Sequence, residues 1–252
     1  MTRGSMPRPP QIVAMGGGGF SMEPENLLLD RFVLSAAKVP APKVCFVGTA
    51  SGDSQIYLDR FYAAFGSLTC VPSHLSLFQP ATADLRGFVL EQDVIYVGGG
   101  NTRNLLVLWR EWGLDAILRE AWLGGIVMAG ISAGSICWFE QGLSDSVIPG
   151  DLAPLDCLGF LAGSNCPHYD GEPQRRPAYH RFIREGQLTP GFAADDGAAL
   201  HFVGHELAGV VSSRENARTY SVRHVGSEVE EVPLDTHWLG SNVETLIEGI
   251  SE

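Results

Sequence analysis

The chain has 252 residues, 45% hydrophobic and 18% charged, which is enough for a substantial core in one large α/β domain or two small ones. Its formal net charge of −12 argues against nucleic acid as a partner, because nucleic acid binding requires a basic face. No apolar run approaches the roughly 20 residues of a membrane span, and the first residues lack the apolar segment of a secretory signal, so no membrane partner is expected.

The opening MTRGSMPRPP (1–10) predicts a disordered lead, and residues 11–252 predict a single domain, because no linker demands a second one. The five cysteines are odd in number and scattered, and no Cys-x-x-Cys pair occurs. They indicate neither a zinc site nor a disulfide framework. We therefore expect a reduced, cytoplasmic protein without a cofactor, for which a homodimer is one oligomeric state left open.

The first half of the chain alternates short buried strands with helices. Strands are predicted at 11–15, 43–47, 68–71, 93–97 and 126–129, and helices at 24–38, 54–65, 102–110 and 114–123. This alternation predicts a mainly parallel sheet with helices on both faces. Ligands bind such sheets at the carboxyl ends of the strands, where the glycine loops 16–19 and 98–100 are also expected.

The second half has a different pattern. Residues 152–161 form a proline-containing connection, followed by GSNCPHYD at 163–170 and a predicted helix at 178–185. The last third predicts antiparallel strands at 197–203, 206–212 and 218–225, with turn residues between them. The tail from residue 228 is polar, and its Trp238 and two leucines are expected to dock on the body.

The glycine loop at 16–19 is typical of nucleotide-binding proteins, yet its spacing does not match their motifs. The G-x-G-x-x-G pattern fails at Ser21, and no G-x-x-x-x-G-K-[ST] occurs in the chain. We interpret the loop as one that allows the backbone to approach a pocket closely.

The stretch GISAG at 130–134 is the strongest indication of chemistry. It follows the strand at 126–129 and precedes a segment, 135–140, that can be helical. Between a strand and a helix, this motif lifts the Ser132 hydroxyl above the sheet edge and directs the Ala133 N–H toward the group that the serine attacks. The alternative is a tight turn whose serine only caps the helix.

A serine nucleophile needs a base, and the base needs an orienting carboxylate. His168 is the best candidate base among the seven histidines, because it lies in a Pro-His turn on a connection leaving the sheet. The order Ser132, Asp145, His168 is similar to that of α/β hydrolases. A second oxyanion donor would come from the loop 98–100. The carboxylates near enough in sequence to complete a triad are Glu140, Asp145, Asp170, Asp195 and Asp196.

The motifs VGGGNT (97–102), GISAGSICWFE (130–140) and PH (167–168) together resemble the peptidase E family of serine dipeptidases, which is related to cyanophycinase. The segments MGGGGFSMEPENLLLD (15–30) and GTASGDS (48–54) resemble a peptidase-E-like branch of that family. The resemblance covers roughly residues 11–225. It implies an α/β fold similar to class I glutamine amidotransferases, flavodoxin-like, in which serine replaces cysteine at the elbow.

The resemblance also implies a nucleophile, a base and two oxyanion donors, which in this chain are Ser132, His168, Gly99 and Ala133. The third triad member of peptidase E is an aspartate shortly after the elbow helix, which approximately matches Asp145. Asp196 competes for that role, because relatives carry an acid at the matching place. No metal is expected, since the chain contains no H-E-x-x-H.

Peptidase E cuts after an N-terminal aspartate and binds the aspartate side chain with an arginine beyond the histidine. Here the clustered arginines after His168 are Arg175 and Arg176, in a local pattern that differs from peptidase E, and with Gly100 they are the expected substrate-binding residues. The predicted function is a serine exopeptidase acting on small peptides, Asp-X dipeptides among them. An esterase or other hydrolase on the same fold, and a non-catalytic small-molecule binding protein, are the alternatives.

Overall fold

The computed structural model describes residues 8–80, 82–148 and 150–241. Residues 1–7 of the predicted disordered lead, and residues 242–252 of the predicted domain, lie outside the described residues. Arg8, which belongs to the predicted lead, donates to the carbonyl of Ala37 and pairs with Asp93 at 3.3 Å, so the described end of the lead is anchored. Among the described residues no helix is both long and apolar enough to cross a bilayer.

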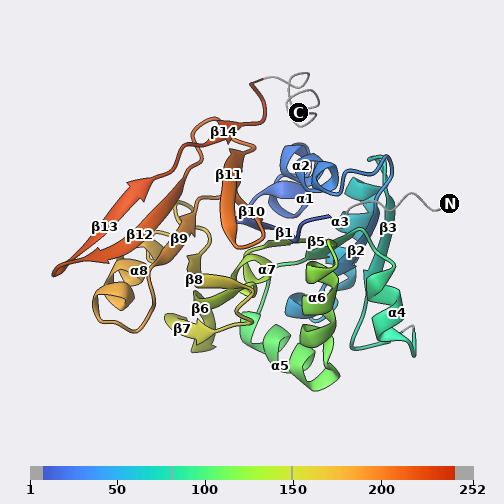
Figure 1. The fold of residues 1–252 in the computed structure, drawn as a ribbon, viewed down its shortest axis with the longest axis horizontal. Coiled ribbons are helices and arrows are strands. Elements are labelled where there is room, and N and C mark those ends of the chain that lie inside the picture. The colour runs from blue at the N-terminus through green and yellow to red at the C-terminus, as the bar shows by residue number, and fades with distance from the viewer. Residues whose placement is uncertain (1–7, 81, 149, 242–252) are drawn as a thin grey trace.

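An eight-stranded sheet forms the centre of the fold, in the order β14-β11-β10-β1-β5-β4-β2-β3 (Figure 1). Its parallel strands are β1 (Gln11–Met15), β5 (Val127–Ile131), β4 (Val94–Val97), β2 (Lys43–Val47) and β3 (Val71–Leu75). Beyond β1 the sheet continues with antiparallel β10 (Ala198–Val203) and β11 (Glu206–Ser212), and then β14 (His237–Trp238). The predicted fold class is confirmed: a mainly parallel sheet flanked by helices, with C-terminal antiparallel strands.

Helices cover both faces of this sheet. One face packs against α1 (Gly19–Met22), α2 (Leu28–Ala36) and α3 (Gln55–Phe65), and the other against α4 (Leu85–Leu90), α5 (Thr102–Trp112) and α6 (Leu114–Leu123). Successive residues of β1 alternate between the two cores, as the period of a strand requires. Because both faces are buried, the central strands are almost continuously apolar, and this is why they could be predicted from the sequence.

A second sheet, which the sequence analysis did not anticipate, lies beside the first. Its order is β13-β12-β9-β8-β6-β7, and its β12–β13 hairpin projects at the left of Figure 1. Helix α8 (Arg175–Arg184) contacts β12 and β13. The strands are β6 (Phe139–Ile148), β7 (Asp151–Asp156), β8 (Leu161–Cys166), β9 (Gly191–Ala194), β12 (Thr219–Val225) and β13 (Glu228–Pro233).

Several predicted boundaries differ from the structure for identifiable reasons. The connection expected at 152–161 contains most of β7, and the polar tail from 228 begins with β13; both strands lie at sheet edges, where neither becomes fully buried. The strand predicted at 68–71 begins at Val71, and its Pro72 is tolerated because β3 is also an edge. The segment at 135–140 is not one helix: α7 (Ala133–Ile136) ends before β6 starts.

Asp30 on α2 is fully buried beneath the glycine loop 16–19 and links two other elements. Its carboxylate accepts hydrogen bonds from the Phe20 N–H at 2.8 Å and from the Tyr96 hydroxyl at 3.0 Å. Burial raises the pKa of Asp30 from its ordinary value of 3.8 to about 6, and these hydrogen bonds offset only part of that effect. The folded chain therefore binds the Asp30 proton more tightly than the unfolded chain does.

This raised pKa predicts a stability change with a defined sign. Protonated Asp30 favours the folded state, so its contribution is fully present below about pH 4 and is lost as the pH rises to about 6. The shift corresponds to roughly 2–3 kcal/mol in the free energy of unfolding. Asp195 has a pKa raised to about 6 by burial as well, so the measurement must isolate Asp30.

The test is urea unfolding of the wild type and Asp30→Asn at several pH values. The free energy of unfolding of the wild type minus that of the variant should fall between about pH 4 and about pH 7, through the folded pKa of about 6, and stay level at higher pH. A difference that is level over the whole range, or that rises with pH, would contradict a raised pKa for Asp30.

Candidate active site

Ser132 follows β5 directly and occupies a strained turn. Its backbone has φ 56° and ψ −113°, a combination that residues with side chains rarely adopt. A Cβ added to Gly130 would lie 2.0 Å from the carbonyl oxygen of Gly134, and one added to Gly134 would lie 2.3 Å from that of Val97. The two small residues flanking the serine are therefore required by space, as the strand–turn–helix motif predicts.

His168 follows β8 and, like Ser132, has a positive φ, of 54°. Among the described residues only four other than glycine have positive φ: Lys38, Asp53, Ser132 and His168. The N–H of Ser132 donates to the carbonyl of Met15, and the N–H of His168 donates to the carbonyl of Gly16, each at 3.2 Å. The predicted nucleophile and base are thus held by consecutive carbonyls at the end of β1. Such strain, about 1–3 kcal/mol per residue, is typical of functional sites.

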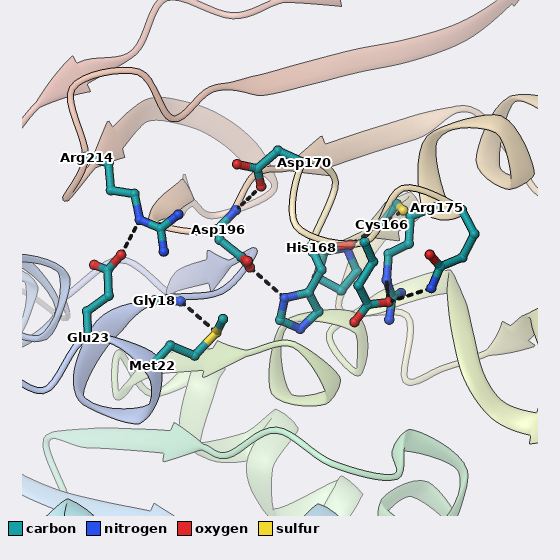
Figure 2. Close-up of polar contacts among 12 residues, drawn as sticks. Gly18, Met22, Glu23, Cys166, His168, Asp170, Arg175, Asp196 and Arg214 are labelled. Carbon is teal, nitrogen blue, oxygen red and sulfur yellow. Dashed lines mark hydrogen bonds and ion pairs between the residues drawn. The ribbon is translucent and has the colours of Figure 1, made fainter. Parts of the chain in front are cut away.

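The His168 ring is paired with Asp196, which follows β9. The His168 Nδ1 and Asp196 Oδ1 atoms are 2.6 Å apart, and both side chains are almost buried (Figure 2). A carboxylate only accepts hydrogen bonds, so His168 Nδ1 carries the proton and Nε2 is left to accept one. No hydrogen bond joins Ser132 Oγ to this ring within the described part of the chain, and in ligand-free sites such contacts are often longer than in the reacting complex.

Asp145, the carboxylate preferred from the sequence, does not lie against His168. It is exposed on β6, beside Ser146, whose hydroxyl accepts the N–H of Thr102 at 2.8 Å. The elbow helix is short and β6 begins at once, so position 145 is carried along the second sheet. Asp196 contacts His168 instead, because β8 and β9 are parallel neighbours and both end at the site.

Two glycines enclose the Asp196 carboxylate. A Cβ added to Gly17 would lie 1.9 Å from Asp196 Oδ1 and 3.0 Å from His168 Nδ1, and one added to Gly171 would lie 2.3 Å from Asp196 Oδ2. Asp170 accepts the Asp196 N–H at 2.8 Å (Figure 2). The carboxylate is therefore fixed on both sides. Within the described chain, no group of three or more His, Cys, Asp or Glu side chains could hold a metal ion.

The expected oxyanion donors lie beside Ser132, although one of them is already occupied. Ala133 is the first residue of α7, so its N–H has no acceptor within the helix. Gly99 is adjacent, since a Cβ added to it would lie 3.8 Å from Ser132 Oγ. Its N–H, however, donates to the Tyr57 hydroxyl at 3.2 Å. Gly100 packs against the backbone of Ala50 and has no room for a side chain.

The two expected substrate-binding arginines are both engaged within the protein. Arg175 is buried, and its guanidinium donates to Glu172 Oε2 at 2.7 Å and to the carbonyl of Leu143 at 3.0 Å. Arg176 stacks on Tyr169 and Tyr220 and pairs with Glu231 on β13. Both arginines are therefore close to the segment that carries His168. Arg175 binds Glu172, whose N–H donates to the carbonyl of His168, and Arg176 stacks on Tyr169, the residue after His168.

Comparisons with known proteins show which family the sequence matches. The sequence profile of Peptidase family S51 matches residues 12–210. An uncharacterized peptidase, YgaJ, from Bacillus subtilis (strain 168) is 63% identical over 230 residues, which cover 91% of this chain and 99% of that protein. An uncharacterized peptidase, Lmo0363, from Listeria monocytogenes (strain EGD-e) is 27% identical over 137 residues, covering 52% of this chain and 67% of that protein.

Two solved structures share the fold at low sequence identity. A peptidase from an acI-B1 Actinobacterium has a TM-score of 0.66 and 15% identity, covering 90% of this chain and 98% of its own. A putative peptidase E protein from Listeria monocytogenes EGD-e has a TM-score of 0.58 and 19% identity, covering 78% of this chain and 96% of its own. At these identities the likeness concerns the fold alone.

Gly17→Ala should separate His168 from Asp196, because the added methyl group would occupy the position of Asp196 Oδ1. The measurement is the far-downfield proton NMR signal expected of an imidazole Nδ1–H bonded to a carboxylate, which should disappear in Gly17→Ala and in Asp196→Asn. Gly209→Ala is the matched control, since no atom lies within 4 Å of a Cβ at that position. A signal that persists in Gly17→Ala would mean that the pair does not depend on this glycine.

Proposed function

Because the chain belongs to Peptidase family S51, we propose that it is a serine exopeptidase that hydrolyses small peptides. Ser132 is the nucleophile, His168 is the base, and Asp196 orients the base. The observation that carries the proposal is the 2.6 Å pair between His168 and Asp196, next to a strained serine elbow that is anchored on the same end of β1.

The geometry supports a two-step acyl transfer. His168 Nε2 accepts the Ser132 proton while Ser132 Oγ bonds to the scissile carbonyl carbon, and the buried Asp196 carboxylate stabilises the imidazolium that forms. The negative charge that develops on the carbonyl oxygen faces the Ala133 N–H at the start of α7. His168 then gives its proton to the leaving amine as the C–N bond breaks. In the second step, His168 Nε2 takes a proton from a water molecule as the water oxygen attacks the acyl carbon. His168 then gives this proton to Ser132 Oγ as the acyl–oxygen bond breaks and the acid leaves.

The substrate is inferred to be a short peptide, from the resemblance to peptidase E. An acidic first residue would need a cation, because burying an unpaired carboxylate is costly. Arg175 and Arg176 are already paired with Glu172 and Glu231, so a substrate aspartate must compete with one of these glutamates. We therefore expect dipeptides with a neutral first residue to be hydrolysed at least as well as Asp-X dipeptides.

The proposed triad is tested with a dipeptide library and four proteins. Ser132→Ala should lower kcat by about 10⁴-fold or more without unfolding the chain. Asp196→Asn should also cost about 10⁴-fold, since the amide favours the wrong imidazole tautomer. Asp145→Asn is the matched control on an exposed strand and should retain activity close to that of the wild type. Equal, small losses in both asparagine variants would contradict an aspartate-assisted triad.

The same assay separates the proposal from other functions. Aryl esters cleaved in the absence of any dipeptide hydrolysis would identify an esterase. No turnover of either class, together with unchanged peptide binding in Ser132→Ala, would identify a binding protein. Activity retained by Ser132→Ala would remove the serine from the mechanism altogether.

Glu172→Gln tests how the acidic substrate is excluded. The substitution leaves the buried Arg175 guanidinium without a carboxylate partner, so a substrate carboxylate that reaches the more exposed position of the Glu172 side chain would pair with it. The ratio of kcat/KM for Asp-Ala to that for Ala-Ala should rise by about tenfold, equivalent to about 1.4 kcal/mol. Arg176→Ala is the control and should leave the ratio unchanged, because Arg176 is paired with Glu231. A wild type that strongly prefers Asp-Ala would overturn this account of specificity.

A further inference from the structure

Tyr57 on α3 contacts the backbone beside the proposed nucleophile. Its hydroxyl accepts the Gly99 N–H at 3.2 Å, and Gly99 is the residue whose added Cβ would lie 3.3 Å from Ser132 Cβ. Position 57 lies within an ordinary amphipathic helix, so its sequence gives no indication of a role in chemistry. The contact arises because α3 follows β2, the strand next to β4, and Gly99 follows β4.

The Tyr57 ring is held in one orientation by aromatic neighbours. The ring centroids of Phe20 on α1 and Phe46 on β2 lie 5.6 Å and 5.0 Å from the Tyr57 ring centroid. A Cβ added to Gly98 would lie 3.0 Å from the ring edge, so the backbone of the glycine loop also confines it. The hydroxyl cannot move away from the Gly99 N–H without displacing several of these groups.

The protonation of Tyr57 suits a hydrogen-bond donor. Burial raises the pKa of Tyr57, and the neighbouring Ser21 and Gly99 N–H offset this only in part. The phenol therefore keeps its proton at neutral pH. Among the described residues, the Tyr57 hydroxyl has one hydrogen bond, which it accepts from the Gly99 N–H, so its O–H remains available to another oxygen atom.

We propose that the Tyr57 hydroxyl, together with the Ala133 N–H, forms the oxyanion hole of this site. The inference rests on the proposed function. Gly99 then acts through Tyr57: its N–H polarises the phenol oxygen, and the phenol O–H donates to the oxygen of the tetrahedral intermediate. The proton stays on Tyr57 throughout, so no additional proton transfer is required. Direct donation by Gly99, expected from the family resemblance, would require breaking its hydrogen bond with Tyr57.

Tyr57→Phe removes the hydroxyl and retains the ring. Loss of one oxyanion donor typically lowers kcat by about 10²–10³-fold, and we expect a loss of that size for dipeptide hydrolysis with little change in KM. Tyr62→Phe is the matched control, because Tyr62 lies on the same helix, is partly exposed, and bonds to His74 instead. Thermal melts of both variants establish that the fold is retained.

A second readout does not depend on peptide hydrolysis. A fluorophosphonate reacts with an activated serine and directs its phosphoryl oxygen at the oxyanion hole, so the rate of Ser132 labelling should fall about 10²-fold in Tyr57→Phe, as for the loss of one donor. Unchanged or faster labelling would overturn the role of Tyr57, since a freed Gly99 N–H would then serve at least as well. Labelling of Ser132 without any peptide hydrolysis would refute the peptidase function while still deciding the role of Tyr57. A wild type that is not labelled would overturn both.

Discussion

The close approach of three chain segments to the end of β1 is the constraint on which the site depends. The carbonyls of Met15, Gly16 and Gly17 accept, in turn, the N–H groups of Ser132, His168 and Gly197. A Cβ at position 16 would lie 2.3 Å from the carbonyl oxygen of Asp195, and one at position 17 would meet Asp196. Only glycine leaves room for this arrangement, so the loop that suggested a nucleotide site instead serves to bring a serine, a histidine and a carboxylate together.

Some of the buried groups around this loop hold the backbone in place, and others are proposed to act in the reaction. Asp30 supports the start of α1 by accepting hydrogen bonds from the Phe20 N–H and from the Tyr96 hydroxyl. In the described chain neither Asp30 nor Tyr96 is hydrogen-bonded to Ser132 or His168. The same aromatic core that surrounds Phe20 also confines Tyr57. A rigid core of this kind supplies preorganisation, because polar groups aimed at a reacting oxygen are effective only when they need not move.

The sequence predicted the features that depend on local pattern. Strands buried on both faces are apolar throughout, and the elbow motif is specified by the space that Gly130 and Gly134 leave, so both were recognisable. The contact of His168 with Asp196 instead of Asp145 was not, because it depends on the pairing of β8 with β9, two strands that the sequence pattern did not predict and that lie far apart along the chain. The engagement of Gly99 by Tyr57 likewise follows from tertiary packing that no periodicity encodes. The pairing of Arg175 with Glu172 is different, because the two residues are three positions apart and the sequence spacing already allows the contact.

The proposed active site is assembled across two sheets whose cores are partly shared. Ser132 follows a strand of the eight-stranded sheet, whereas His168 and Asp196 follow strands of the smaller one. Residues of β6 and β8 pack into the main core, and the smaller sheet also has a distinct cluster around Leu143, Tyr179 and Ile183. Opening of this distinct cluster would withdraw His168 from Ser132 while most of the main core stayed packed. Subglobal opening of this kind costs less than global unfolding. Turnover by the proposed peptidase would then cease at denaturant concentrations where most of the secondary structure persists, and inactivation would report the local stability of this cluster instead of that of the whole chain.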